Sequence, residues 1–319
     1  MAAITQAFVL GAGLGTRLRP LTDDLPKPLV PIFQKRLITF ALDHLIDLGI
    51  GRFYINTHHL PERFGEIFPE ATYRGNRIRF FHEPELLETA GGIANVAPSL
   101  GNGPLLVYNG DILTDLPLAS LVDSHFCGGN LVTLALRSNA EPKHVAFDPG
   151  NGRIVDIGNQ LGTDAAQEFL FTGIYLVDPR FVDLLDRGVK RSVIPHFIEL
   201  IRRRERIGGV VIDKGHWWDV RDRAAYIALH QNLPSLKFPS YPVDDVNWTA
   251  PIHQTAVVDP TATVIGWSAV GRDCRVGPDA ALENTIVWPG SQIASSSRLF
   301  GCIVRTHKSV SGIYRDTDI

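Results

Sequence analysis

The segment GAGLGTRLRPLT at residues 11–22 comes directly after the apolar run Ala7–Leu10. Three glycines within five residues leave the backbone bare, so its N–H groups can approach phosphate oxygens closely. The dinucleotide fingerprint needs a glycine where Thr16 stands, and the Walker loop needs Gly-Lys-Ser/Thr after four spacers, so neither pattern fits. The loop therefore predicts a polyphosphate site of another kind, in which Arg17 and Lys27 supply positive charge.

The charge balance and the apolar pattern exclude several classes of function. The chain has 319 residues, 31 Lys+Arg and 34 Asp+Glu, and its net charge of −3 provides no global positive field for nucleic acid or an acidic membrane. No apolar run approaches the roughly eighteen residues that span a bilayer. The three cysteines lack the C-x-x-C spacing of zinc and redox sites. We expect a cytoplasmic protein that binds small anions locally, with no nucleic acid and no membrane partner.

Residues 5 to about 232 alternate short apolar strands with amphipathic helices. This order predicts an α/β fold, Rossmann-like, with a mainly parallel mixed sheet and helices on both faces. The expected strands are Ala7–Leu10, Phe53–Thr57, Ile78–Phe81, Leu105–Asn109, Leu131–Leu136 and Phe169–Val177. Helices are expected between residues 37 and 48, over Pro179–Leu185 and over Val193–Arg204.

A different pattern begins after residue 233. Four prolines between residues 234 and 251 indicate an extended connector. From Ile252 onward apolar residues recur every six positions, which is typical of a parallel β-helix in which three hexads form one triangular coil. The inward positions predicted by this count are Val258, Val264, Val270, Val276, Leu282, Trp288, Ala294 and Phe300, with the pattern weakening after Leu282. The expected division is an α/β domain at 1–233, a Pro-rich linker at 234–251 and a hexapeptide-repeat domain at 252–319.

The stretch Gly11–Lys27 closely resembles the signature of the sugar-phosphate nucleotidyltransferases, or nucleotide-sugar pyrophosphorylases, which reads G-x-G-T-R-L-x-P-x-T and then P-K. The resemblance covers residues 5–232. It continues through Glu83, Glu88–Ile93, Asn109-Gly110-Asp111, Phe171–Ile174 and Trp218-Asp219-Val220. Within the family the chain is similar to mannose-1-phosphate guanylyltransferases and N-acetylmuramate-1-phosphate uridylyltransferases, and its tail matches the left-handed β-helix that many such enzymes append.

The resemblance implies an enzyme of the EC 2.7.7 type that joins a nucleoside triphosphate to a sugar 1-phosphate and releases pyrophosphate. It implies Mg²⁺ held by Asp111 and Asp219, and catalysis by Arg17, Lys27 and Asp111. The expected nucleotide-binding residues are Gly11, Ala12, Gly13, Gly15, Thr16, Arg17, Lys27, Glu83, Ala90, Gly91 and Asp111, and the expected sugar-binding residues are Asn109, Thr172 and Gly173. The position of Asp111 just after a strand agrees with this, because ligands collect at the carboxyl ends of strands in open α/β sheets.

The base and the sugar are less constrained than the reaction. A carboxylate at Glu83, the position that reads the base in the family, can accept from both N1–H and N2–H of guanine, which favours GTP with mannose 1-phosphate or a related sugar. A uridylyltransferase that uses UTP with N-acetylmuramate or glucose 1-phosphate is the alternative. The chain also departs from the family after Val220, where Arg221-Asp222 replace the usual Gly-Thr, and this change bears on how Asp219 is aimed.

Two other classes of function compete with catalysis of this kind. A catalytically silent regulatory paralogue would be expected to have lost Arg17, Lys27 or Asp111, and all three are present. An acyltransferase built on the hexapeptide repeat would need a catalytic histidine, whereas His253 and His307 fall at the two ends of the repeat. The repeat is better suited to assembly, so we expect a homo-oligomer formed through the C-terminal β-helix.

Overall fold

The computed structural model describes residues 4–163, 167–236, 238 and 248–319, and the contacts within it group into two compact units. The first unit contains the chain through Leu14 together with Ile38–Asp219. The second contains Gly15–Leu37 together with Val220–Ile319. Residues 237 and 239–247 of the predicted linker lie outside the described residues.

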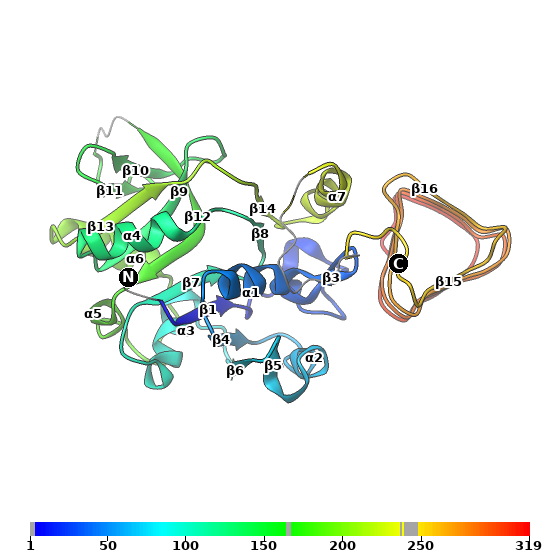
Figure 1. The fold of residues 1–319 in the computed structure, drawn as a ribbon, viewed down its shortest axis with the longest axis horizontal. Coiled ribbons are helices and arrows are strands. Elements are labelled where there is room, and N and C mark those ends of the chain that lie inside the picture. The colour runs from blue at the N-terminus through cyan, green and yellow to red at the C-terminus, as the bar shows by residue number, and fades with distance from the viewer. Residues whose placement is uncertain (1–3, 164–166, 237, 239–247) are drawn as a thin grey trace. The chain divides into compact units, whose positions relative to one another are not determined.

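The first unit is built on a ten-stranded mixed sheet in the order β10-β11-β13-β9-β12-β7-β1-β4-β6-β5 (Figure 1). The strands are β1 Gln6–Leu10, β4 Arg52–Thr57, β5 Thr72–Tyr73, β6 Asn76–His82, β7 Leu105–Asn109, β9 Val132–Arg137, β10 Val145–Asp148, β11 Arg153–Ile157, β12 Glu168–Val177 and β13 Ile207–Val211. The prediction of a mainly parallel mixed sheet agrees with the parallel pairings in β7-β1-β4-β6 and in β9-β13. The sheet is mixed because β12 runs antiparallel between β7 and β9, and because β5, β10 and β11 also pair antiparallel.

Helices cover both faces of this sheet, as predicted. Alternate side chains of a strand point to opposite faces. On β9, Leu134 packs into the core cluster formed with α3, α5 and α6, whereas the hydroxyl of the adjacent Thr133 lies 2.9 Å from His125 of α4. On β7, the Tyr108 hydroxyl lies 3.2 Å from His44 of α1. The helices are α1 Leu37–Asp47, α2 Glu62–Ile67, α3 Glu88–Val96, α4 Ala119–Gly128, α5 Pro179–Val182 and α6 Val193–Arg202, the last two ending earlier than predicted.

Short elements complete the two units. In the first they are the 3-10 turns η3 Pro69–Ala71 and η4 Ala97–Ser99 and the strand pair β8 Ile112–Thr114 and β14 Trp217–Asp219. In the second they are η1 Thr16–Leu18, η2 Lys27–Leu29, the hairpin β2 Pro31–Ile32 and β3 Lys35–Arg36, helix α7 Arg223–Asn232 and η5 Leu233–Ser235.

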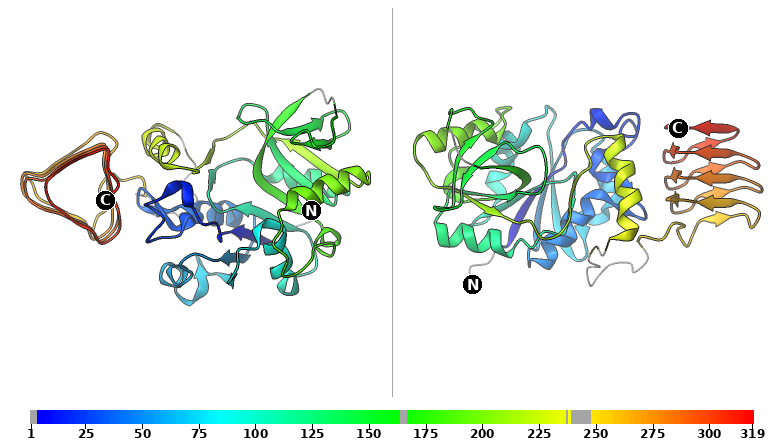
Figure 2. Two further views of the ribbon diagram at one scale, coloured as in Figure 1. Left: turned by 180° about the vertical axis from the view of Figure 1, so that it is seen from behind. Right: turned by 90° about the horizontal axis from the view of Figure 1, so that it is seen from above.

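The C-terminal part of the second unit is a stack of short parallel strands. The stack is triangular in cross-section (Figure 1) and its coils lie one above another (Figure 2). One sheet contains β15 Val257–Val258, β18 Arg275–Val276, β21 Gln292–Ile293 and β24 Ser309–Val310; the second contains β16 Thr263–Ile265, β19 Ala281–Glu283, β22 Arg298–Phe300 and β25 Ile313–Arg315; the third contains β17 Ala269–Val270, β20 Ile286–Val287 and β23 Ile303–Val304.

The inward register agrees with the six-residue count only as far as Leu282. The ladder places Val287 directly above Val270, so the step after Leu282 is one residue short, and the step from Leu299 to Val304 is short in the same way. The predicted inward positions Trp288, Ala294 and Phe300 are therefore wrong. The core contains Val287, Ile293 and Leu299 in their place. A shorter corner after β19 and β22, and not a loss of the fold, explains why the repeat seemed to weaken.

Among the described residues, no helix combines the length and the apolar character needed to cross a membrane.

This register can be tested with two adjacent residues. Leu299 is fully buried in the core of the stack, while Phe300 is half-buried and packs 4.0 Å from the Arg315 guanidinium. We expect Leu299→Ala to lower the free energy of unfolding by about 2–5 kcal/mol, because it leaves a cavity, and Phe300→Ala to lower it by less. Urea denaturation of the two variants measures the order, and the reverse order would restore the six-residue register.

Candidate active site

The first half of the glycine loop, residues 11–13, follows β1 and is hydrogen-bonded to the side chain of Asn56. The Gly11 N–H donates to the Asn56 Oδ1 atom at 2.8 Å, and the Asn56 side chain is buried at the end of β4. Ala12 is buried beside it, whereas Gly13 is exposed. The backbone that faces outward at this strand end is therefore that of Gly13, supported by a fixed Gly11.

The second half of the loop turns at Gly15. Its φ of 62° is in the left-handed region, and a Cβ there would lie 2.9 Å from Thr22 Cγ2 and 3.0 Å from Lys27 Cβ. The Gly15 carbonyl accepts from the Thr22 hydroxyl at 2.9 Å. Only the three-residue turn η1 follows, so no long helix begins at this loop.

Asn56 also connects the glycine loop to Glu83. The Asn56 Nδ2 atom donates to Glu83 Oε1 at 2.8 Å, and the Leu87 N–H donates to Glu83 Oε2 at 2.9 Å. Glu83 is fully buried. Burial raises the pKa of this carboxyl above its ordinary value, and the hydrogen bonds from Leu87 and Asn56 oppose that rise. Gly11, Asn56, Glu83 and Leu87 thus form one buried chain of hydrogen bonds.

The first turn of α3 is fixed by hydrogen bonds to the segment Arg191–Val193. The Ala90 and Gly91 N–H groups donate to the Arg191 carbonyl at 2.9 and 3.3 Å, and the Thr89 hydroxyl accepts from the Val193 N–H at 2.8 Å. Both Ala90 and Gly91 are buried. Their N–H groups are therefore engaged within the protein. A ligand that reached this segment would make van der Waals contacts with it and no hydrogen bonds to these two N–H groups.

A bulge in β12 brings the predicted sugar-binding residues together. The β9–β12 register shifts between Phe171 and Tyr175. Within the bulge Gly173 has φ of 77°, and a Cβ there would lie 2.6 Å from Asn109 Nδ2. Asn109 and Gly173 are therefore in contact. The Thr172 hydroxyl is buried and donates to the Ala135 carbonyl at 2.8 Å, so it supports the bulge from inside.

The two predicted metal ligands lie at neighbouring strand ends. Asp111 precedes β8, and β8 pairs antiparallel with β14 so that Ile112 is opposite Asp219. Both aspartates are half-buried. Over the ranges the structure describes, no group of three or more His, Cys, Asp and Glu is placed to hold a metal. Two carboxylates fit Mg²⁺, which commonly binds one or two of them and keeps water and phosphate as its other ligands.

The predicted cationic residues belong to the second unit. Thr16 and Arg17 are exposed in η1, and Lys27 is buried at the first position of η2, directly after Pro26. Each of the two cations therefore lies on a three-residue 3-10 turn.

The departure at Arg221-Asp222 has a local explanation. Asp222 is the N-cap of α7, and its Oδ1 atom accepts from the Ala225 N–H at 2.8 Å. Threonine and aspartate both cap helices well. Asp222 thus performs the capping expected of the usual threonine, while Asp219 is the last residue of β14.

Asn56 is the residue that sequence reasoning missed. Its signal was a polar side chain inside the predicted apolar strand Phe53–Thr57. Its partner Glu83 is 27 residues away in the chain, so the spacing alone does not reveal the bond.

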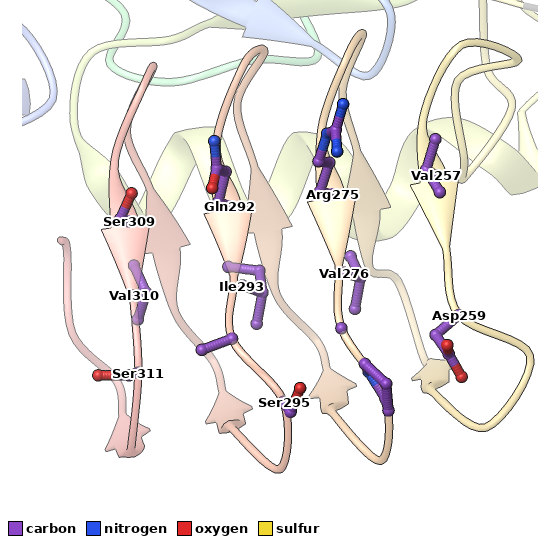
Figure 3. Close-up of a pocket in the computed structure, with 13 residues that line it drawn as sticks. Val257, Asp259, Arg275, Val276, Gln292, Ile293, Ser295, Ser309, Val310 and Ser311 are labelled. Carbon is purple, nitrogen blue, oxygen red and sulfur yellow. The ribbon is translucent and has the colours of Figure 1, made fainter.

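The repeat has a hollow of its own along the outside of β15, β18, β21 and β24, with a volume of about 430 Å³ (Figure 3). Its charged lining residues are Asp259 and Arg275, and the other lining residues are uncharged. No histidine lines this hollow as the structure describes it, so it does not contain the catalytic histidine expected of an acyltransferase.

We expect Asn56→Ala to weaken nucleotide binding and stability together. The change leaves the buried Gly11 N–H and one Glu83 oxygen without their partner, at a cost of about 1–3 kcal/mol for each unsatisfied group. Urea denaturation and the KM for the nucleoside triphosphate measure the two effects. Asn76→Ala is the control, since that amide donates only to the Arg74 carbonyl in a turn. Equal behaviour of the two variants would contradict the role given to Asn56.

Comparisons with known proteins identify the family of the chain. The chain is 30% identical over 304 residues to the mannose-1-phosphate guanylyltransferase of Mycobacterium tuberculosis, covering 93% of this chain and 82% of the relative. It is 23% identical over 339 residues to the UTP–glucose-1-phosphate uridylyltransferase of Synechocystis, covering 94% and 87%.

The fold is also found among solved structures. HddC from Yersinia pseudotuberculosis, complexed with GMP-PN, superposes with a TM-score of 0.59 at 18% identity, over 71% of this chain and 98% of that one. The family model for nucleotidyl transferases matches residues 6–235. The chain therefore belongs to the nucleotidyl transferase family and is a sugar-phosphate nucleotidyltransferase.

Proposed function

We propose that this enzyme joins GTP to mannose 1-phosphate, or to a closely related sugar 1-phosphate, with release of pyrophosphate. The observation that carries this choice is the 30% identity, over 93% of the chain, to a mannose-1-phosphate guanylyltransferase. The likeness to a uridylyltransferase at 23% identity supports the alternative, UTP with glucose or N-acetylmuramate 1-phosphate.

In the proposed reaction a phosphate oxygen of the sugar 1-phosphate attacks the α-phosphorus in line, the new P–O bond forms, and the bond to pyrophosphate breaks. Every reactant is an anion, so positioning and charge neutralisation supply most of the acceleration. Backbone N–H groups of the glycine loop, from Gly11 through Thr16, would hold the triphosphate. Arg17 would grip its leaving end, and Lys27 would neutralise the α-phosphate and the incoming sugar phosphate.

Asp111 and Asp219 would hold Mg²⁺, which when bound neutralises phosphate charge and orients the reacting oxygens. Asn109 and Gly173 would contact the sugar, and Thr172 would act by supporting the bulge that carries Gly173. These roles rest on the match to the family motifs and on the neighbouring positions described above.

For Glu83 we propose a positioning role. Glu83 is fully buried and its two oxygens accept from Asn56 and Leu87, so it would act by fixing the segment Leu87–Gly91. The preference for guanine then rests on the relatives and not on this side chain.

We further propose the domain organisation 1–233, 234–251 and 252–319, with the C-terminal stack as a left-handed β-helix of the hexapeptide type. The three parallel sheets with a shared apolar core support this. Assembly into a homo-oligomer through the β-helix and a cytoplasmic location stay predictions.

We expect Asp111→Asn and Lys27→Ala to reduce turnover by at least about a thousandfold, since each removes charge aimed at the transferring phosphate. Pyrophosphate release measures the rate, and circular dichroism checks the fold. Asp123→Asn and Lys214→Ala, both on the surface, are the matched controls and should be as active as the unchanged enzyme. Near-normal turnover in either test variant would refute its catalytic role.

The substrate is tested by a matrix of GTP, UTP, dTTP, ATP and CTP against mannose, glucose, N-acetylmuramate and heptose 1-phosphates. We expect the highest kcat/KM for GTP with mannose 1-phosphate. A higher value for UTP with any of these sugars would establish the alternative.

A further inference from the structure

The segment Gly15–Leu37, which contains Arg17 and Lys27, packs in the second unit with α7 and the C-terminal stack. A side chain of the stack reaches the middle of this segment. The Arg305 Nη1 atom donates to the Pro20 carbonyl at 3.2 Å and to the Asp24 Oδ2 atom at 2.8 Å. Pro20 and Asp24 both lie between Arg17 and Lys27 in the chain, so this contact fixes the backbone that joins the two cations.

Arg305 is itself held in place. Its Nε atom donates to the Ile319 carbonyl at 3.2 Å, and its side chain is only 17% exposed. Lys308 Nζ adds a second cation 3.6 Å from the same Asp24 oxygen. An arginine that binds a carbonyl and a carboxylate through one rigid guanidinium fixes geometry in a way that an exposed single ion pair does not.

A second, buried connection joins the stack to the same segment through α7. The Trp288 Nε1 atom donates to the Tyr226 hydroxyl at 3.0 Å, and that hydroxyl donates to the Pro31 carbonyl at 2.5 Å. The Phe33 N–H donates to His230 Nε2 at 3.2 Å, while His230 Nδ1 bonds to the Tyr226 carbonyl at 3.0 Å. Trp288, Tyr226 and His230 are fully buried. The segment is thus anchored before and after Lys27.

We propose that Arg305 is a positioning residue for nucleotidyl transfer: through Pro20 and Asp24 it sets the positions of Arg17 and Lys27. This inference rests on the proposed roles of those two cations. It gives the C-terminal stack a part in catalysis within a single chain, in addition to any part in assembly.

The test compares Arg305→Ala with Arg275→Ala in the full-length chain. Arg275 is an exposed arginine of the same stack, on β18. We expect Arg305→Ala to lower kcat/KM for the nucleoside triphosphate by roughly ten- to a hundredfold, because small displacements of catalytic groups have effects of this size. Arg275→Ala should match the unchanged enzyme, and Arg305→Lys should recover only part of the loss, because lysine lacks the planar fork.

Asp24→Asn keeps the inference testable if Arg305→Ala folds poorly, because Asp24 is 45% exposed. It should lower kcat/KM on its own, and the double variant Asp24→Asn/Arg305→Ala should be scarcely worse than Arg305→Ala alone. Hydrogen exchange should rise in peptides from residues 15–29 of Arg305→Ala and stay unchanged in β1 and β7.

The outcomes separate the two proposals. Suppose that the unchanged enzyme is active. A normal kcat/KM in Arg305→Ala, or additive losses in the double variant, would then overturn the positioning role and leave the proposed function intact. Absence of pyrophosphate release from the unchanged enzyme with every sugar and nucleotide pair would refute the proposed function itself.

Discussion

The side chain of Asn56 makes the contacts on which the order of the first half of the glycine loop depends. Its oxygen accepts from the Gly11 N–H and its nitrogen donates to Glu83, in a place from which water is excluded. Because buried polar groups are costly to leave unpaired, the glycine loop and the segment after Glu83 are fixed together. A loop rich in glycine would otherwise be mobile, and a mobile phosphate-binding loop would have to be ordered by each substrate.

In the second unit, hydrogen bonds from distant residues likewise fix the backbone near Arg17 and Lys27. Arg17 and Lys27 lie on short 3-10 turns that have little stability of their own. Their backbone is anchored by Arg305 on one side and by the Tyr226 hydroxyl on the other. A family domain that matches residues 6–235 therefore obtains part of its order from residues beyond that range. The shorter corner after β19 matters here, because it places Val287 in the core and turns the next residue, Trp288, toward Tyr226.

The sequence was informative where local patterns decide structure. The six predicted strands correspond to β1, β4, β6, β7, β9 and β12, and Gly11–Lys27 was sufficient to predict phosphate chemistry. It was less informative where distant partners decide orientation. The hydrogen bonds from Asn56 to Glu83 and from Thr172 to the Ala135 carbonyl join residues 27 and 37 positions apart, which no local pattern specifies. The antiparallel direction of β12 in the sheet depends on its pairing with β7 and β9, which no local pattern specifies.

The most direct test of this account is a crystal structure of the enzyme with Mg²⁺ and a non-hydrolysable GTP analogue. We predict phosphate oxygens within hydrogen-bonding distance of the backbone N–H groups of residues 12–16, with the metal at Asp111 and the Asn56–Gly11 and Asn56–Glu83 bonds intact. A triphosphate bound elsewhere, or a Glu83 carboxylate turned out to pair with the base, would contradict it.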